Sequence, residues 1–165
     1  MKKIVFFMIF LCNISLIYPQ LNSSFKVIQG RNTLDEKGML LDINRASKAD
    51  MLKVSISKGY VDKIIEYRDI TGGFKNLKDM RRISGIGKKT FERLKVFFKI
   101  SSNITLKNFN INSANSKVLK YYGFNKKEIK KIEIFRKKQK IRNNNQFKKI
   151  ISKEKYKELK DIVSF

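Results

Sequence analysis

The chain has 165 residues, of which 38 are Lys or Arg and 14 are Asp or Glu, so its formal net charge at pH 7 is +24. It contains no His and a single Cys, Cys12, which excludes zinc sites built from His and Cys clusters and catalysis by Ser–His or Cys–His pairs. The acidic residues form no D-x-D or D-x-E cluster suited to two metal ions, so we predict that the chain is not an enzyme. A field this positive attracts polyanions, although an AT-rich genome also raises the Lys content without selecting for a partner.

The first 20 residues have the pattern of an export signal. Met1-Lys2-Lys3 precede an apolar run that begins at Ile4 and continues, with interruptions, to Tyr18. A basic start followed by a short apolar stretch is typical of a secretory signal peptide. We therefore predict that residues 1–20 are a signal peptide or a membrane anchor, and that the protein is exported to the periplasm or held at the outer face of the inner membrane. Residues 21–40 show no periodicity, and we expect a flexible linker there.

The rest of the chain contains one pattern twice. Leu41–Ser47 and Phe109–Asn115 share the form apolar-Asp/Asn-Ile-Asn-x-Ala, and the spacing of 68 residues persists to Arg68 and Arg136. Self-similarity of this kind indicates tandem structural units. We predict an all-α fold in which residues 41–100 form one unit of short helices joined by tight hairpins and residues 108–165 form a second, degenerate unit.

Helix signals in the first unit predict two hairpins that pack side by side. Ser47 and Asp50 have the spacing of a capping box, for a helix that runs to about residue 54. A turn at residues 55–57 leads to a helix over about 58–70, which Gly72-Gly73 ends. Phe74 returns to the core, and Asn76 with residue 79 caps a third helix.

The most informative stretch is Ser-Gly-Ile-Gly-Lys-Lys-Thr at residues 84–90, which leads into a fourth helix. Its glycines let backbone N–H groups approach an anion closely, and the open N-terminus of the next helix favours negative charge. The spacing fits neither a dinucleotide-binding fingerprint nor a P-loop. We predict phosphate binding here; the alternative is a tight turn between packed helices that binds nothing. The predicted phosphate-binding residues are Ser84, Gly85, Ile86, Gly87, Lys88, Lys89, Thr90 and Arg93.

The second unit keeps one glycine turn, Tyr122-Gly-Phe-Asn125. If Phe147 is matched with Phe74 and Tyr156 with Phe91, this unit lacks eight residues and the second Gly-x-Gly turn. We expect a basic helix over about 126–140, a polar loop over 142–146 and a last helix over about 152–163. The predicted secondary contacts, at the other hairpins, are Ser55, Ile56, Ser57, Lys58, Gly123, Asn125, Lys126 and Lys127.

The stretches at residues 42–47, 64–68, 73–74 and 84–90 together resemble the helix-hairpin-helix domain of the ComEA competence proteins. The resemblance is specific over residues 41–100 and fainter over 109–163. It implies an exported, non-catalytic protein that holds double-stranded DNA without regard to sequence and passes it to an uptake channel in the inner membrane. It also implies phosphate contacts at Gly85, Gly87, Lys88, Lys89 and Thr90. The chain departs from the family at the first hairpin, where Ser55-Ile56-Ser57 replaces a Gly-hydrophobic-Gly turn.

We therefore predict that the partner is double-stranded DNA and that the chain has no small-molecule substrate and no metal site. The sequence leaves open whether a monovalent cation sits in the turn at Gly85–Gly87; no other cofactor is expected. One alternative is a structural module that binds proteins of an envelope secretion or pilus machine, for which the Lys88/Lys89 turn would be covered by the second unit. Another is a surface protein that binds anionic lipid or other polyanions, for which heparin and duplex DNA would bind equally well.

Overall fold

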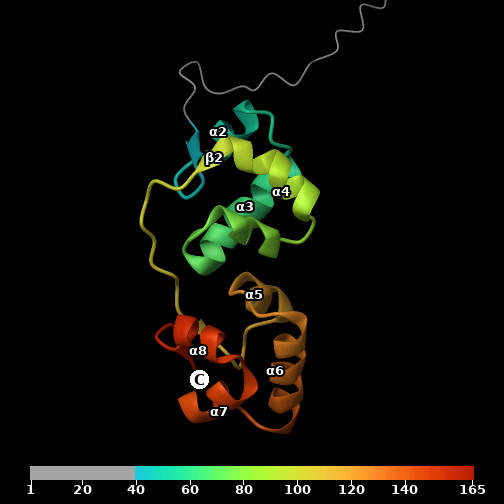
Figure 1. Ribbon diagram of the computed structural model, residues 1–165, viewed down its shortest axis with the longest axis vertical. Helices are drawn as coiled ribbons and strands as arrows, with labels where there is room; N and C mark the ends of the chain where they lie inside the picture. The colour runs from blue at the N-terminus through green and yellow to red at the C-terminus, as the bar shows by residue number, and fades with distance from the viewer. Residues whose placement is uncertain (1–39) are drawn as a thin grey trace, which may run out of the picture. The chain divides into compact units, whose positions relative to one another are not determined.

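The computed structural model describes residues 40–165 (Figure 1). The predicted export signal, and the predicted linker apart from Leu40, lie outside these residues. The described part of the chain is mostly helical. None of its helices is long and apolar enough to cross a membrane.

The first repeat, residues 41–100, folds as two helical hairpins closed by a short strand pair. In chain order its elements are β1 (Leu41–Asp42), α2 (Lys48–Lys53), α3 (Lys58–Thr71), the 3-10 helix η2 (Leu77–Arg82), α4 (Lys88–Leu94), the 3-10 helix η3 (Lys95–Phe97) and β2 (Phe98–Lys99). Strands β1 and β2 pair in parallel, with Leu41 opposite Phe98. The expectation of an all-α fold is therefore corrected in detail, because the two ends of the repeat form a small parallel pair.

The predicted helix boundaries in the first repeat follow from local chemistry. Ser47 and Asp50 form the expected capping box at the start of α2, and Asn76 forms another with Asp79 at the start of η2. Gly72 ends α3 in the left-handed conformation, at φ +90°, which glycine adopts without steric cost. The third helix of the repeat differs from the expectation only in being a 3-10 helix.

The second repeat, residues 108–165, has the same order of elements except that it has no counterpart of η3. They are β3 (Phe109–Asn110), α5 (Ser116–Tyr121), α6 (Lys126–Lys138), α7 (Asn144–Ile150), α8 (Lys153–Leu159) and β4 (Val163–Ser164). Strands β3 and β4 pair in parallel, with Phe109 opposite Val163. The predicted polar loop over residues 142–146 is wrong, because Asn143 caps α7 and the helix buries Phe147 and Ile150 at helical spacing.

The matching of Phe147 with Phe74 is also wrong. In the first repeat the Asn44 amide donates to the Phe74 carbonyl at 3.0 Å and accepts from the Phe74 N–H at 2.7 Å. Asn112 forms the same pair of hydrogen bonds with Ile141, at 2.8 and 2.9 Å. Ile141 is therefore the counterpart of Phe74, and the loop before α8 has two residues where the loop before α4 has five. The second repeat thus lacks the glycine turn but not eight residues.

The repeated sequence motif is explained by these contacts. Arg68 donates to the carbonyls of Ile43 and Ala46 at 3.1 and 2.7 Å, and Arg136 donates to the carbonyl of Ala114 at 2.7 Å. In each repeat, backbone carbonyls of the Ile-Asn-x-Ala segment accept hydrogen bonds from an arginine of the second helix. The Asn side chain of the segment bonds to the backbone of the loop that follows that helix. Its role is to hold the two hairpins of each repeat together.

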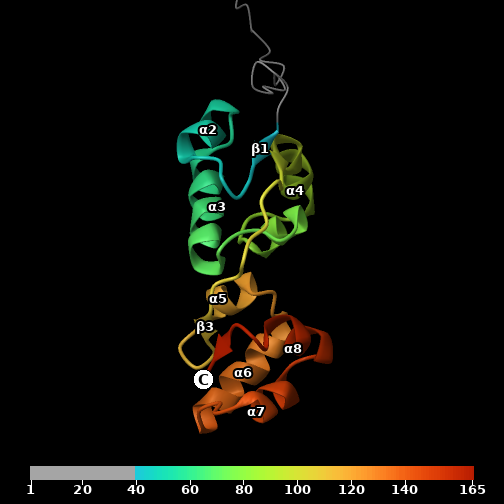
Figure 2. The same ribbon diagram turned by 90° about the vertical axis from the view of Figure 1, so that its left-hand side faces the viewer.

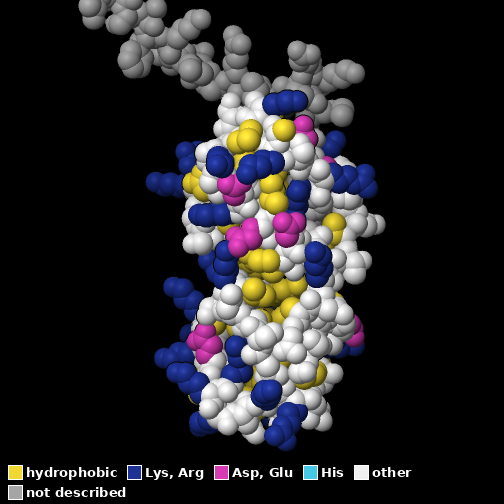
Figure 3. Space-filling view, turned by 180° about the vertical axis from the view of Figure 1, so that it is seen from behind, with side chains coloured by type: hydrophobic (Ala, Val, Ile, Leu, Met, Phe, Trp, Pro, Cys, Tyr) yellow, Lys and Arg dark blue, Asp and Glu magenta, His cyan; other side chains and the backbone are white. Residues whose placement is uncertain are grey.

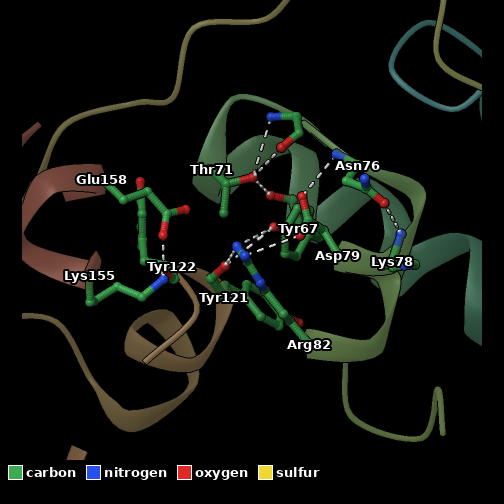
Figure 4. A network of polar contacts seen from close by, with 11 residues as sticks. Tyr67, Thr71, Asn76, Lys78, Asp79, Arg82, Tyr121, Tyr122, Lys155 and Glu158 are labelled. Carbon is green, nitrogen blue, oxygen red and sulfur yellow. Dashed lines mark hydrogen bonds and ion pairs between the residues drawn. The ribbon is translucent and has the colours of Figure 1, made fainter. Parts of the chain in front are cut away.

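Each repeat has its own hydrophobic core, and Tyr121 of α5 belongs to the core of the first repeat. The Tyr121 ring lies 5.0 Å from the Tyr67 ring of α3, and α5 lies next to the C-terminal end of α3 in both views (Figures 1 and 2). The Tyr67 hydroxyl donates to the Tyr121 carbonyl at 3.3 Å, and Arg82 donates to the same carbonyl at 3.1 Å (Figure 4). Arg82 is also paired with Asp79 at 3.1 Å.

Burial at this contact changes the acidity of the phenols. It raises the pKa of Tyr67 to about 12. It is also the main reason that the pKa of Tyr121 rises to about 12, with a further contribution from the neighbouring Glu66 carboxylate. Both hydroxyls therefore stay protonated in the folded protein well above the usual value of 10.0 for a tyrosine.

We expect Asn44→Ala to lower the free energy of unfolding by about 2 kcal/mol, because it leaves the N–H and C=O of the buried Phe74 without partners. Urea unfolding followed by circular dichroism measures this change. The matched control is Asn145→Ala in α7, an exposed position where a change within about 0.5 kcal/mol is expected. Equal effects of the two substitutions would contradict the structural role of Asn44.

We expect the free energy of unfolding to fall as the pH rises from about 10 to about 12, because the unfolded chain releases phenol protons that folded Tyr67 and Tyr121 retain. Tyr67→Phe removes one of these groups, so its stability should fall less steeply over that range. Urea unfolding of the wild type and the variant across this pH range gives the two slopes. Identical slopes would contradict the raised pKa of Tyr67.

Candidate nucleic-acid interface

Three hairpin turns in the described residues share one backbone design. Each has a residue with positive φ, Ser55 at +62°, Gly85 at +89° or Gly123 at +83°. The next residue in each turn is apolar and almost fully buried: Ile56, Ile86 and Phe124 expose 2–3% of their surface. Serine at the first turn therefore adopts the conformation that glycine adopts at the other two, at a steric cost of about 1–2 kcal/mol.

The Ser84–Thr90 turn leads into α4 and includes its first residues, and the N-terminus of this helix is open. Ile86 anchors it from the inside, since its N–H donates to the Ile83 carbonyl at 3.1 Å. Ile86 is one of the predicted site residues, and its role in the structure is to hold the turn in place. Gly87 is the N-cap residue of α4, and a Cβ added there would meet nothing within 4 Å. The turn thus leaves open space in front of the helix end.

The backbone donors at this helix end are free of intrahelical partners. The Phe91 N–H donates to the Gly87 carbonyl at 2.8 Å as the first bond of the helix, so the N–H groups of residues 88–90 point out of its end. The Lys88 and Lys89 side chains are exposed, and that of Thr90 is half-buried. Peptide dipoles add partial positive charge at the same place.

Helices α3 and α4 differ from the other α-helices of residues 40–165 in their N-caps. Neither Ser57 before α3 nor Gly87 before α4 makes a side-chain capping hydrogen bond. At every other α-helix in this part of the chain the N-cap side chain accepts a backbone N–H; those residues are Ser47, Asn115, Asn125, Asn143 and Ser152. The two helix ends left open are those that follow the two hairpin turns of the first repeat.

The first turn lies beside α4. A hollow with a volume of about 340 Å³ is lined by Ser55, Ile56, Ser57, Tyr60, Thr90, Arg93, Leu94 and Phe97. It brings the predicted secondary residues 55–57 together with Thr90 and Arg93 of the main site. Lys58, at the start of α3, is exposed, as is Arg93. The expectation that the two hairpins pack side by side is thus met.

Sequence reasoning missed Lys63 of α3. Its ammonium donates to the Ser84 carbonyl at 3.0 Å and lies 3.3 Å from the place where a Cβ on Gly85 would be. Lys63 therefore adds a positive charge to the turn from a different hairpin. Nothing in the local sequence marks it, because the contact joins residues that are 21 positions apart.

The turn of the second repeat is closed by its surroundings. Asn125 and Glu128 form a capping box that fills the N-terminus of α6 with a carboxylate. A Cβ on Gly123 would lie 2.8 Å from the Lys155 ammonium and 2.9 Å from the Arg82 guanidinium carbon. The geometry therefore gives no support to phosphate contacts at Gly123 and Asn125, whereas the side chains of Lys126 and Lys127 are exposed. The described residues contain no cluster of acidic or Cys side chains that could hold a metal ion, and a monovalent cation at Gly85–Gly87 stays a prediction.

We expect Gly85→Ala to lower the free energy of unfolding by about 1–2 kcal/mol, because alanine is strained at φ +89° and its methyl group would crowd Lys63. Gly87→Ala is the matched control, since Gly87 has φ −79° and open space around it. Thermal or urea unfolding of the two variants measures the difference. A Gly85→Ala variant as stable as Gly87→Ala would contradict the proposed turn geometry.

The comparisons with known proteins agree with this geometry. Residues 36–99 match the family model described as the helix-hairpin-helix motif. The chain is 38% identical over 72 residues to ComE operon protein 1 of Bacillus subtilis, which covers 43% of this chain and 32% of that protein. It is 35% identical over 63 residues to endonuclease/exonuclease/phosphatase family domain-containing protein 1 of zebrafish, and 32% identical over 63 residues to the human protein of that name.

The matched region is a small part of these relatives. It covers 38% of this chain in both animal comparisons but only 12% of the zebrafish protein and 11% of the human protein. This chain therefore spans at most about a third of the relatives that it matches. No solved structure matches it. The first repeat carries a helix-hairpin-helix motif, and the chain is similar over that stretch to ComE operon protein 1.

Proposed function

We propose that the first repeat binds double-stranded DNA through its phosphate backbone, without reading the base sequence. The observation that carries this proposal is the pair of open helix N-termini. Among the α-helices of residues 40–165, only α3 and α4 begin without a side-chain cap, and both begin at a hairpin turn. A backbone end without its own acceptor can donate to a phosphate oxygen, and the helix dipole favours the negative charge.

The side chains around the two turns suit phosphates better than bases. Apart from the lysines, the turn residues are Ser, Gly and Thr, which are too short to reach base edges in a groove, and the buried Ile56 and Ile86. Lys88, Lys89 and Arg93 are exposed and add charge beside the donors, and Lys63 adds a fourth basic group at the Ser84 carbonyl. Contacts to phosphates carry no sequence information, so duplexes of different sequence should bind alike.

The Ser84–Thr90 turn is exposed, which supports DNA binding over a role as a covered protein interface. The Lys88 and Lys89 side chains are exposed, and neither residue lines the groove where the two repeats meet. If the chain were a structural module of an envelope machine, we would expect the second repeat to cover this turn, and it leaves Lys88 and Lys89 exposed. The uncapped helix ends likewise favour an anionic ligand over an apolar protein surface.

We also propose that the protein acts outside the inner membrane, in the uptake of DNA, and hands its DNA to a membrane channel. The N-terminal pattern of residues 1–20 supports export, and the similarity to ComE operon protein 1 supports the uptake role. The proposed role is binding without catalysis. The similarity to the endonuclease/exonuclease/phosphatase family domain-containing proteins spans at most 12% of those relatives, so it lends no support to a nuclease activity.

We expect Lys88→Glu/Lys89→Glu to weaken duplex binding by roughly tenfold or more at physiological salt, because it replaces two positive charges beside the open end of α4 with negative ones. Acidic residues in a first helical turn do not disfavour the helix, so helicity should be kept. Fluorescence anisotropy of a labelled duplex, titrated with the full chain at several salt concentrations, measures the affinity. Four to six phosphate contacts predict a log–log salt slope of about −4 to −5 for the wild type.

The matched control is Lys75→Glu/Lys78→Glu, which makes the same change in net charge at two exposed positions. These positions lie at the N-terminal end of η2, whereas the Ser84–Thr90 turn follows its C-terminal end. The control should keep most of the affinity. Equal losses in the two variants would mean that the attraction is generic and that the turn is not the site. Equal affinity for heparin and duplex DNA, unaffected by Lys88→Glu/Lys89→Glu, would favour a polyanion-binding surface protein instead.

A further inference from the structure

The two repeats meet at a groove that is lined mainly by basic side chains. Its volume is about 590 Å³. The lining residues come from η2 and the following turn and from α5 and α6; they are Arg82, Ser84, Ser116, Lys117, Lys120, Tyr121, Lys126, Ile129, Lys130 and Glu133. The groove therefore has five basic residues and one acidic residue.

Three of the lysines in this groove lack a counter-charge. Arg82 is paired with Asp79 and Lys117 with Glu66. Lys120, Lys126 and Lys130, by contrast, form no ion pair within residues 40–165, and all three are exposed.

The arrangement of these lysines is unfavourable on its own. Lys126 and Lys130 are four positions apart on α6, where like charges repel. Glu133, the acidic residue of the groove, accepts a hydrogen bond from the Ser116 hydroxyl at 2.6 Å. The uncompensated charge therefore suits an anionic ligand.

The groove is continuous with the turn that we propose as the phosphate site. Ser84 lines the groove and is also the first residue of the Ser84–Thr90 turn. Arg82 lies two residues before the start of that turn and donates to the Tyr121 carbonyl of α5 at 3.1 Å (Figure 4). A DNA strand held at the turn would therefore have positive charge beside it in the second repeat. Figure 3 shows Lys and Arg side chains spread over one face of both repeats, with several Asp and Glu side chains among them.

The position of these lysines relative to the turn is fixed by contacts between the repeats. Tyr121 is buried in the core of the first repeat, and the Lys107 N–H donates to the Thr71 carbonyl at 2.8 Å. The Tyr122 hydroxyl lies 3.0 Å from the Ile70 carbonyl. Charges whose backbone positions are fixed lose less chain entropy on binding than charges on a mobile segment would.

We propose that this groove carries the phosphate backbone of the duplex onward from the second hairpin, so that the second repeat extends the DNA site. It does so through Lys120, Lys126 and Lys130, and not through its own turn, which is closed by the Asn125/Glu128 capping box. This inference rests on the proposed DNA binding by the first repeat. The function that it gives the degenerate repeat is to add further contacts to the DNA phosphates.

The test is the triple variant Lys120→Gln/Lys126→Gln/Lys130→Gln in the full chain, which removes three charges without adding a negative one. Loss of three phosphate contacts should make the log–log salt slope shallower by about 2 to 3 and weaken duplex binding by about tenfold at 0.1–0.2 M salt. A stoichiometric titration at low salt should show fewer base pairs covered per protein molecule. Replacing the same three residues with Arg should keep the slope and the site size. Circular dichroism and thermal unfolding check that the variants are folded.

The matched control is Lys149→Gln/Lys153→Gln/Lys157→Gln, three exposed lysines of α7 and α8 outside the groove. This control should change the slope by less than one. A groove variant with the wild-type slope and site size, or a control that loses as much, would overturn the inference. The Lys88→Glu/Lys89→Glu variant separates the two proposals. If that variant loses duplex binding while the groove variant binds normally, the first repeat binds DNA but the second repeat does not extend the site.

Discussion

The hairpin turn with a left-handed residue and a buried apolar neighbour is the constraint on which the structure depends. At each of the three such turns the chain reverses at a residue with positive φ, and the next side chain is buried in the core of its repeat. The buried side chain fixes where the following helix starts. In the first repeat this leaves two helix ends open beside each other, because the residues that reverse the chain there, Ser57 and Gly87 included, provide no cap. The residues that shape these turns are thus also the ones that we propose to contact phosphates.

Local sequence signals predicted much of the first repeat. The capping boxes at Ser47 and Asn76 and the glycine that ends α3 act within a few residues, so their effect can be derived without tertiary information. The turn at Ser84–Thr90 was located for the same reason, since its glycines and lysines are adjacent in the chain. Lys63 was not, because its contact with Ser84 depends on how two hairpins pack.

The errors in the second repeat also have a physical origin. An aromatic residue, Phe147, was taken as the counterpart of Phe74, but the contact that defines the position is made by backbone atoms. Ile141 satisfies it equally well, because any residue can offer an N–H and a C=O. The missed helix α7 is polar in its first turn, and its two buried side chains, Phe147 and Ile150, are too few to give a clear periodic signal. The paired strands have two residues each, which is too short to give a recognisable sequence pattern.

The parallel pairing of the first strand with the last has a consequence for how each repeat forms. Leu41 pairs with Phe98, and Phe109 pairs with Val163, so each repeat is closed by contacts between its two ends. Such non-local contacts must wait until the intervening chain is in place, and they slow folding relative to a bundle of purely local hairpins. A first repeat that emerges from a ribosome therefore cannot form its strand pair until residues 98–99 have followed. Closure of its strand pair then depends on the arrival of residues 98–99, and its core is complete only when Tyr121 of the second repeat has been added.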